Sequence, residues 1–172
     1  MESKSSSIPV KKYKVGMYGG KFMPLHKGHL RCLQIAAEEC ELVYFILFYG
    51  GNQENDIVKE YPNDKDLILE NRIKQMQRAA ASYSNVCSVL IDVTDCKLPD
   101  GTEDWDAETP LVLNVCGHLD AVYGSEPSYK AYFDRAYPDA VYRCIDPERK
   151  EMNISATMVR AMSPEERKEW MV

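Results

Sequence analysis

The sequence predicts a single α/β domain built on a parallel, doubly wound sheet of the Rossmann-like type. Short apolar runs alternate with helical patterns along the chain, which is typical of this class. One of those runs, residues 41–50 (ELVYFILFYG), is almost continuously apolar, as in strands buried on both faces of a parallel sheet. The 172 residues suffice for one such domain with a full core and are too few for two. We therefore expect ligands at the carboxyl ends of the strands, where the topology switches.

The first strand, helix and strand of the domain follow directly from the residue pattern. Residues 13–18 (YKVGMY) predict the first strand, and residues 41–50 predict the second. Between them, four small or apolar residues recur at the spacing of one helical face. They are Leu30, Leu33, Ala37 and Cys40.

The alternation then continues with a second helix and a third strand. Residues 65–83 predict the helix, and residues 86–92 (VCSVLID) predict the strand. The apolar stripe of the helix consists of Leu69, Ile73, Met76 and Ala80.

A third helix is predicted from its end signals. Thr109 fits an N-cap, Pro110 a first-turn proline and Gly117 a terminating glycine, although residues 111–115 (LVLNV) alone fit a strand equally well. Three further elements complete the alternation: strands over residues 121–125 and 140–145, and a helix over residues 127–137.

Composition narrows the classes of function. A hydrophobic fraction of 45% and a charged fraction of 28% are ordinary for a folded domain, and the net charge of -6 argues against nucleic acid or anionic lipid as a partner. Residues Met1–Lys12 are rich in Ser and Lys and predict a flexible tail before a domain over residues 13–172. Because no apolar run has the length of a signal peptide or membrane span, we expect a cytoplasmic protein. The six cysteines form no C-x-x-C pair and are expected to be reduced.

Residues 19–29 (GGKFMPLHKGH) follow the first predicted strand and are the first candidate site. His26 and His29 lie three residues apart at the start of a helix, so both imidazoles can project to the same side. The helix N-terminus adds free N–H groups, and Lys21 adds a full charge, which together favour a phosphate. Three glycines are expected to permit a tight turn or leave room for a bulky ligand: Gly19, Gly20 and Gly28.

Residues 154–160 (ISATMVR) are the second candidate site. Ser155 can cap a helix whose first turn carries Thr157, with Arg160 one turn further, so hydroxyls and a guanidinium become available to phosphate oxygens. Taken alone, the segment fits an ordinary capped surface helix equally well. A second anion site after a different strand favours the functional interpretation.

With both motifs in view, the sequence resembles the H-x-G-H nucleotidylyltransferase superfamily from Val15 to Met162. GGKFMPLHKGH is similar to the pattern G-x-F-x-P-x-H-x-G-H, and ISATMVR is similar to I-S-x-T-x-x-R. Within the superfamily, the segments YGSEPSYKAYF and DPERKEMNIS look most like the nicotinamide mononucleotide (NMN) adenylyltransferase domain of NadR-like proteins.

This resemblance implies transfer of AMP from ATP to NMN, which forms NAD and pyrophosphate, with Mg²⁺ as cofactor and no metal ligand from the protein. The catalytic positions that it implies are His26, His29, Lys21 and Arg160. The ATP-binding positions are Gly19, Gly20, Phe22, Gly124, Ser125, Ser155 and Thr157. The substrate-binding positions are Trp105, which would stack on nicotinamide or belong to the core, and Asn153.

Three other functions remain compatible with the motifs. The first is another adenylyl- or cytidylyltransferase with a different phosphorylated substrate, a choice that would depend on the loops at residues 52–64 and 95–108. The second is a nucleotide-sensing module without turnover, which the complete set of catalytic residues disfavours. The third is a fragment of a class I aminoacyl-tRNA synthetase, disfavoured by the missing K-M-S-K-S motif. The sequence leaves open whether NMN or its deamidated form is used, and whether the chain forms a homo-oligomer.

Overall fold

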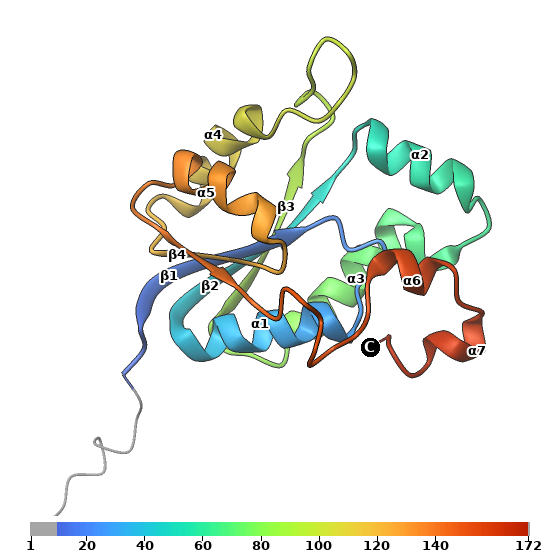
Figure 1. Cartoon of the computed structure of the whole chain (residues 1–172), viewed down its shortest axis with the longest axis horizontal. Coiled ribbons are helices and arrows are strands. Elements are labelled where there is room, and N and C mark those ends of the chain that lie inside the picture. The colour runs from blue at the N-terminus through green and yellow to red at the C-terminus, as the bar shows by residue number, and fades with distance from the viewer. Residues whose placement is uncertain (1–9, 172) are drawn as a thin grey trace, which may run out of the picture.

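The computed structural model describes residues 10–171, which form one α/β domain around a five-stranded sheet (Figure 1). The strands are Tyr13–Gly20 (β1), Cys40–Tyr49 (β2), Val86–Asp92 (β3), Ala121–Gly124 (β4) and Val141–Cys144 (β5). All paired strands are parallel, in the order β3-β2-β1-β4-β5. The direction of winding reverses between β1 and β4, so the predicted doubly wound sheet is confirmed.

Helices cover both faces of the sheet. Figure 1 shows α1 (Lys27–Glu39) and α3 (Leu69–Ala80) on one face, with α4 (Trp105–Cys116) and α5 (Lys130–Ala136) on the other. Leu33 and Met76 belong to the core on the first face, and Val112 belongs to the core on the second. Because both faces are covered, the middle of β2 is fully buried, as the apolar run of residues 41–50 predicted.

Five short elements complete the chain. They are α2 (Asn52–Glu60), the 3₁₀ turns η2 (Lys65–Leu67) and η3 (Pro127–Tyr129), α6 (Ala156–Arg160) and α7 (Pro164–Arg167). The sequence pattern did not reveal two of them, the helices at residues 52–60 and 164–167. The predicted loop at residues 52–64 is therefore wrong, since α2 occupies most of it. Polar side chains dominate α2, so it lacks the apolar stripe that reveals a helix in sequence.

Two predicted boundaries are wrong within the first half of the chain. Cys40 does not continue the stripe of α1, because its backbone is already extended and it begins β2. The helix predicted over residues 65–83 is interrupted at Ile68, whose φ and ψ of -66° and 130° are not helical. Asp64 caps the separate η2 turn by accepting a hydrogen bond from the Asp66 amide at 3.1 Å.

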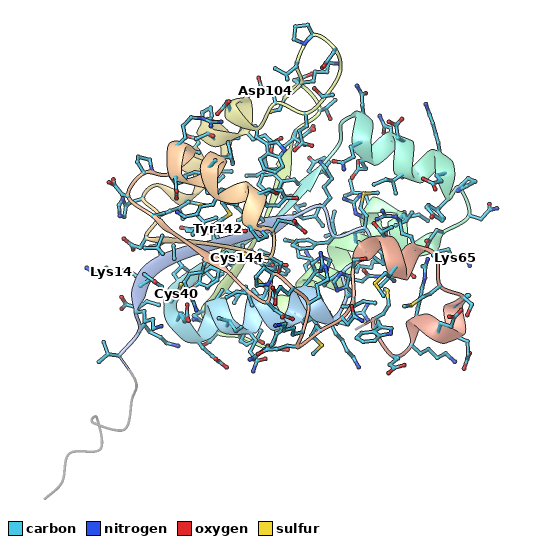
Figure 2. All side chains as sticks on the ribbon, in the orientation of Figure 1. Lys14, Cys40, Lys65, Asp104, Tyr142 and Cys144 are labelled. Atoms are coloured by element: carbon cyan, nitrogen blue, oxygen red, sulfur yellow. The ribbon has the colours of Figure 1, made fainter. Side chains whose placement is uncertain are left out.

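The third helix begins earlier than its end signals predicted. Asp104, labelled in Figure 2 at the start of α4, caps the helix by accepting hydrogen bonds from the amides of Asp106 and Ala107. Thr109 is therefore not the N-cap, and Pro110 lies inside the helix. The helical assignment itself and its end at Gly117 are confirmed, which rules out a strand over residues 111–115.

Of the predicted tail Met1–Lys12, residues 1–9 lie outside the described residues. Lys11 donates a hydrogen bond to the carbonyl of Ala37 at 3.0 Å. No helix within residues 10–171 is both long and apolar enough to cross a membrane.

The Arg72 side chain of α3 joins three segments around the carboxyl end of β1. It is 1% exposed, forms an ion pair with Glu54 of α2, and donates two hydrogen bonds to the Lys21 carbonyl at 3.2 and 2.7 Å. Glu54 in turn accepts a hydrogen bond from the Gly50 amide at 2.7 Å. One buried guanidinium therefore fixes the loops that follow both β1 and β2.

Replacing Arg72 with methionine should destabilise the fold strongly, because the substitution leaves the Glu54 carboxylate buried without its partner. We expect the free energy of unfolding to fall by about 3 to 5 kcal/mol, measured by urea denaturation. Lys74 on the same helix forms an exposed ion pair with Glu70, so Lys74→Met is the matched control and should cost less than about 1 kcal/mol. Equal losses in the two variants would show that the Arg72 network does not organise these loops.

Candidate active site

A cavity of about 470 Å³ opens at the carboxyl ends of β1 and β4, where the winding of the sheet reverses. The predicted site residues that line it are Gly19, Gly20, Lys21, Phe22, His26, His29, Trp105, Gly124, Ser125, Ser155, Thr157 and Arg160. Asn153 does not line the cavity and is exposed instead. The fold therefore brings together every predicted position except Asn153.

The two imidazoles form the start of α1 as well as part of the cavity wall. His26 is the N-cap, and its Nδ1 accepts a hydrogen bond from the Gly28 amide at 3.0 Å. His29 reaches back, and its Nδ1 accepts from the His26 amide at 3.1 Å. The rings stack with their centroids 3.7 Å apart. Both Nδ1 atoms are thus acceptors, which assigns the proton of each neutral ring to Nε2.

Both imidazoles are neutral at pH 7. Burial, with the nearby positive charge of Arg149, lowers the pKa of His26 to about 4. Burial also lowers the pKa of His29, and repulsion from Arg149 and from a protonated His26 lowers it further. Among the described hydrogen bonds, neither Nε2 has a protein partner. The site therefore presents two N–H donors that need not gain or lose a proton to bind an anion.

The glycines of the first motif have a different role from the one their positions predicted. Gly19 and Gly20 belong to β1 and form no tight turn. A Cβ atom at Gly19 would lie 2.5 Å from the Phe48 ring, and one at Gly20 would lie 2.9 Å from the Phe22 ring. Glycine is therefore required there because aromatic rings occupy the space of a side chain.

Gly28 lines the cavity, and protein atoms also fill the space that a side chain there would need. A Cβ atom there would lie 2.8 Å from Cε1 of His26 and 3.0 Å from Cγ2 of Ile154. The glycine lets the His26 ring fold over the first turn of α1 and lets the segment before α6 pack against it. It thereby joins the first motif to the second.

The turn between β1 and α1 depends on Phe22. Its φ of 50° lies in the left-handed region, which is unfavourable for a bulky residue. The side chain is 3% exposed and packs against Phe45 and His29, with ring centroids 5.1 and 4.9 Å away. This packing holds the backbone in the conformation that directs the His29 ring.

The second motif is attached to the first by Arg160. Its guanidinium donates to the Met23 carbonyl at 2.8 Å and to the Thr157 hydroxyl at 3.3 Å. Ser155 caps α6 as predicted, since its hydroxyl accepts a hydrogen bond from the Met158 amide at 3.2 Å. The two phosphate-binding candidates therefore form one surface.

Arg167 fixes α6 against the rest of the domain. It donates to the carbonyls of Val159 and Arg160, and it forms ion pairs with Asp64 and Asp66 on either side of Lys65. Figure 2 shows Lys65 beside the C-terminal helices. The orientation of the second motif thus depends on a residue outside both motifs.

Arg149 is a site residue that the motif analysis missed. It lines the cavity and donates a hydrogen bond to the Ile154 carbonyl at 2.9 Å, and its charge depresses both histidine pKa values. The signal was present in the segment DPERKEMNIS, where the arginine stands four residues before the asparagine that was predicted instead. Arg149 has a φ of 54°, a turn geometry that the sequence pattern does not indicate.

The other end of the cavity is aromatic and acidic. Trp105 is the first residue of α4, half-buried, with its ring centroid 4.8 Å from that of Tyr129 and 5.2 Å from that of Tyr132. Glu103 pairs with the Lys21 ammonium at 2.6 Å, and Glu108 lies buried one turn into the helix. Sequence reasoning singled out Trp105 and missed both acids, although they flank it in the segment EDWDAE.

The two acids have opposite protonation. Burial, together with the hydrogen bond and negative charge of Glu103, raises the pKa of Glu108 to about 9. Burial opposes ionisation of Glu103, but hydrogen bonds from Glu108 and Lys21 keep its pKa below the ordinary value. At pH 7, Glu103 is a carboxylate and Glu108 is a neutral carboxylic acid.

Fold and site together define a nucleotide-binding α/β domain with the Rossmann-like fold of nucleotidylyltransferases. The chain belongs to the cytidylyltransferase-like family, whose model matches residues 17–162.

Among the relatives, the trifunctional NAD biosynthesis/regulator protein NadR of Salmonella typhimurium is 22% identical over 156 residues, which are 89% of this chain and 38% of the relative. The Escherichia coli protein of the same name is 21% identical over the same shares of the two chains. The chain therefore spans less than half the length of these relatives.

Solved structures share the fold at similar identity. A NadR protein in complex with NAD and AMP-PNP superposes with a TM-score of 0.67 at 22% identity, covering 94% of this chain and 46% of that one. A bifunctional NMN adenylyltransferase/ADP ribose pyrophosphatase from Francisella tularensis gives 0.59 at 24% identity, covering 86% and 41% of the two chains. At these identities the likeness shows the fold alone.

Proposed function

We propose that the protein is a nicotinamide-nucleotide adenylyltransferase that transfers AMP from ATP to NMN, forming NAD and pyrophosphate. The observation that carries this proposal is the division of one cavity into two ends. Neutral imidazole donors with Arg160 and Thr157 line the first, and the aromatic rings around Trp105 line the second. A triphosphate suits the first end, and a pyridinium ring suits the second, because cationic rings bind well to aromatic faces.

The chemistry that we propose is direct in-line displacement. A phosphate oxygen of NMN attacks the α-phosphorus of ATP, a new P–O bond forms, and the bond to pyrophosphate breaks. The Nε2–H groups of His26 and His29 donate to the phosphate oxygens on which negative charge increases. Thr157 and Arg160 hold the β- and γ-phosphates, and Gly124 with Ser125 borders the adenosine. Catalysis is then positioning and electrostatic stabilisation, with no covalent intermediate on the protein.

Magnesium enters this proposal with the triphosphate. Within residues 10–171, no group of three or more His, Cys, Asp or Glu side chains could hold a metal ion. Mg²⁺ in phosphoryl-transfer sites keeps several waters and binds largely to substrate phosphates, so a site without a protein cage is compatible with it. When bound there, the ion neutralises charge on the triphosphate.

The first test is a pyrophosphate-release assay with Mg²⁺, supplying ATP or CTP with NMN and with other phosphorylated acceptors. We expect turnover with ATP and NMN, with NAD identified as the product. Turnover of CTP without turnover of ATP would instead favour a cytidylyltransferase. Binding of ATP with no turnover of any acceptor would favour a nucleotide-sensing module.

His29→Asn separates the catalytic role of His29 from its capping role. The asparagine amide oxygen can occupy the place of Nδ1 and accept from the His26 amide, while the Nε2–H donor is lost. We expect kcat to fall by about 10² to 10³, the usual effect of removing one donor to a transition-state oxyanion, with little change in melting temperature. His29→Ala is the comparison, because it removes the cap as well and should also cost stability. A His29→Asn enzyme with kcat close to wild type would limit His29 to a structural role.

Trp105→Ala tests the substrate end. Loss of an aromatic stacking surface is worth about 1 to 3 kcal/mol, so the KM for NMN should rise about tenfold or more, while the KM for ATP should change little. Steady-state kinetics with each substrate varied in turn provide the comparison. Parallel increases in both KM values, together with a lower melting temperature, would show that Trp105 is a structural core residue and does not bind the substrate ring.

A further inference from the structure

Glu108 is a buried side chain on the cavity wall with an unused hydrogen-bonding atom. It is 6% exposed, and its Oε2 has no hydrogen-bond partner in the part of the chain that the structure describes. Leaving a buried polar atom unpaired is costly, and such atoms are uncommon in folded proteins. The Glu108 side chain lines the cavity one helical turn from Trp105, at the end where we place the substrate ring.

The neighbouring Glu103 determines what this oxygen can do. Glu108 is a neutral acid at pH 7 and Glu103 is a carboxylate, so Glu108 is the donor of the hydrogen bond between them. Because Oε2 has no partner, we assign that hydroxyl to Oε1. The remaining oxygen, Oε2, is then a carbonyl-type atom, which accepts hydrogen bonds and cannot donate them. A ligand that satisfies it must bring an N–H or O–H group.

We propose that Glu108 selects the acceptor substrate by accepting a hydrogen bond at Oε2 from the carboxamide N–H of the nicotinamide ring. This inference rests on the proposed function, and it specifies the amide form of the mononucleotide over its deamidated acid. Glu108 is then a specificity residue that contacts the substrate, and Trp105 supplies the face on which the ring lies.

The charges around Glu108 disfavour the deamidated substrate. A carboxylate in place of the carboxamide has no N–H to offer to Oε2 and would lie near the negative charge of Glu103. Lys21, the cation whose charge acts on Glu108, is already paired with Glu103 at 2.6 Å. A site built to bind a polar hydrogen discriminates strongly against an analogue that lacks it, because its own buried atom is then left unpaired.

The experiment compares binding of NAD and of its deamidated counterpart by calorimetric titration, with no turnover required. Wild-type protein should bind NAD about 100-fold more tightly or better. Glu108→Met keeps the side-chain length and removes the acceptor, so the ratio should fall about tenfold or more through weaker binding of NAD. Glu108→Gln keeps an acceptor and still donates to Glu103, so it should retain most of the ratio. Melting temperatures of both variants check that they fold.

The outcomes separate this inference from the proposed function. Equal binding of the two dinucleotides by wild-type protein, or an unchanged ratio in Glu108→Met, would overturn the role of Glu108 even if the enzyme makes NAD. Selective binding of NAD that depends on Glu108, without any adenylyl transfer, would support the inference and overturn the proposed activity.

Discussion

The pair of hydrogen bonds at the start of α1 is the constraint from which the chemistry of the site follows. Each imidazole accepts a backbone N–H through Nδ1, so the same bonds that begin the helix also determine which nitrogen faces the cavity. Gly28 is required because the His26 ring lies over it, and Phe22 adopts an unfavourable backbone conformation beneath His29. The site is thereby built into the junction of β1 and α1, and it is not an addition to the surface of the fold.

Much of the fold could be predicted because its strongest signals are local. Apolar runs identified all five strands, helical stripes identified α1 and α3, and end signals identified α4, while the alternation identified the parallel sheet. The errors occurred where local signals compete or are weak. Pro110 resembled a first-turn proline, but the Asp104 carboxylate caps the helix earlier. The polar helix α2 could not be seen because it is fixed by one buried ion pair between Glu54 and Arg72, which are 18 residues apart in sequence.

The candidate site was predictable where motif residues act through their own chemistry, and not where they act through distant neighbours. His26, His29 and Arg160 were assigned from type and spacing, and the structure places them on one cavity. Arg149 and Glu108 could not be distinguished from surface charges, because what matters is the burial and the neighbours that the fold gives them. Arg149 adds to the effect of burial in lowering the pKa of both imidazoles, and Glu108 is itself a neutral acid at the other end of the cavity.

The proposed chemistry requires His26 and His29 to be neutral Nε2–H donors in the free protein. Two-dimensional ¹⁵N NMR of histidine-labelled protein at pH 7 tests this requirement directly, with the third histidine, His118, assigned by substitution. Both rings are expected to carry a proton on Nε2 alone, and the His26 ring is expected to titrate with a pKa of about 4. A cationic ring at pH 7, or a proton on Nδ1 of either histidine, would contradict it.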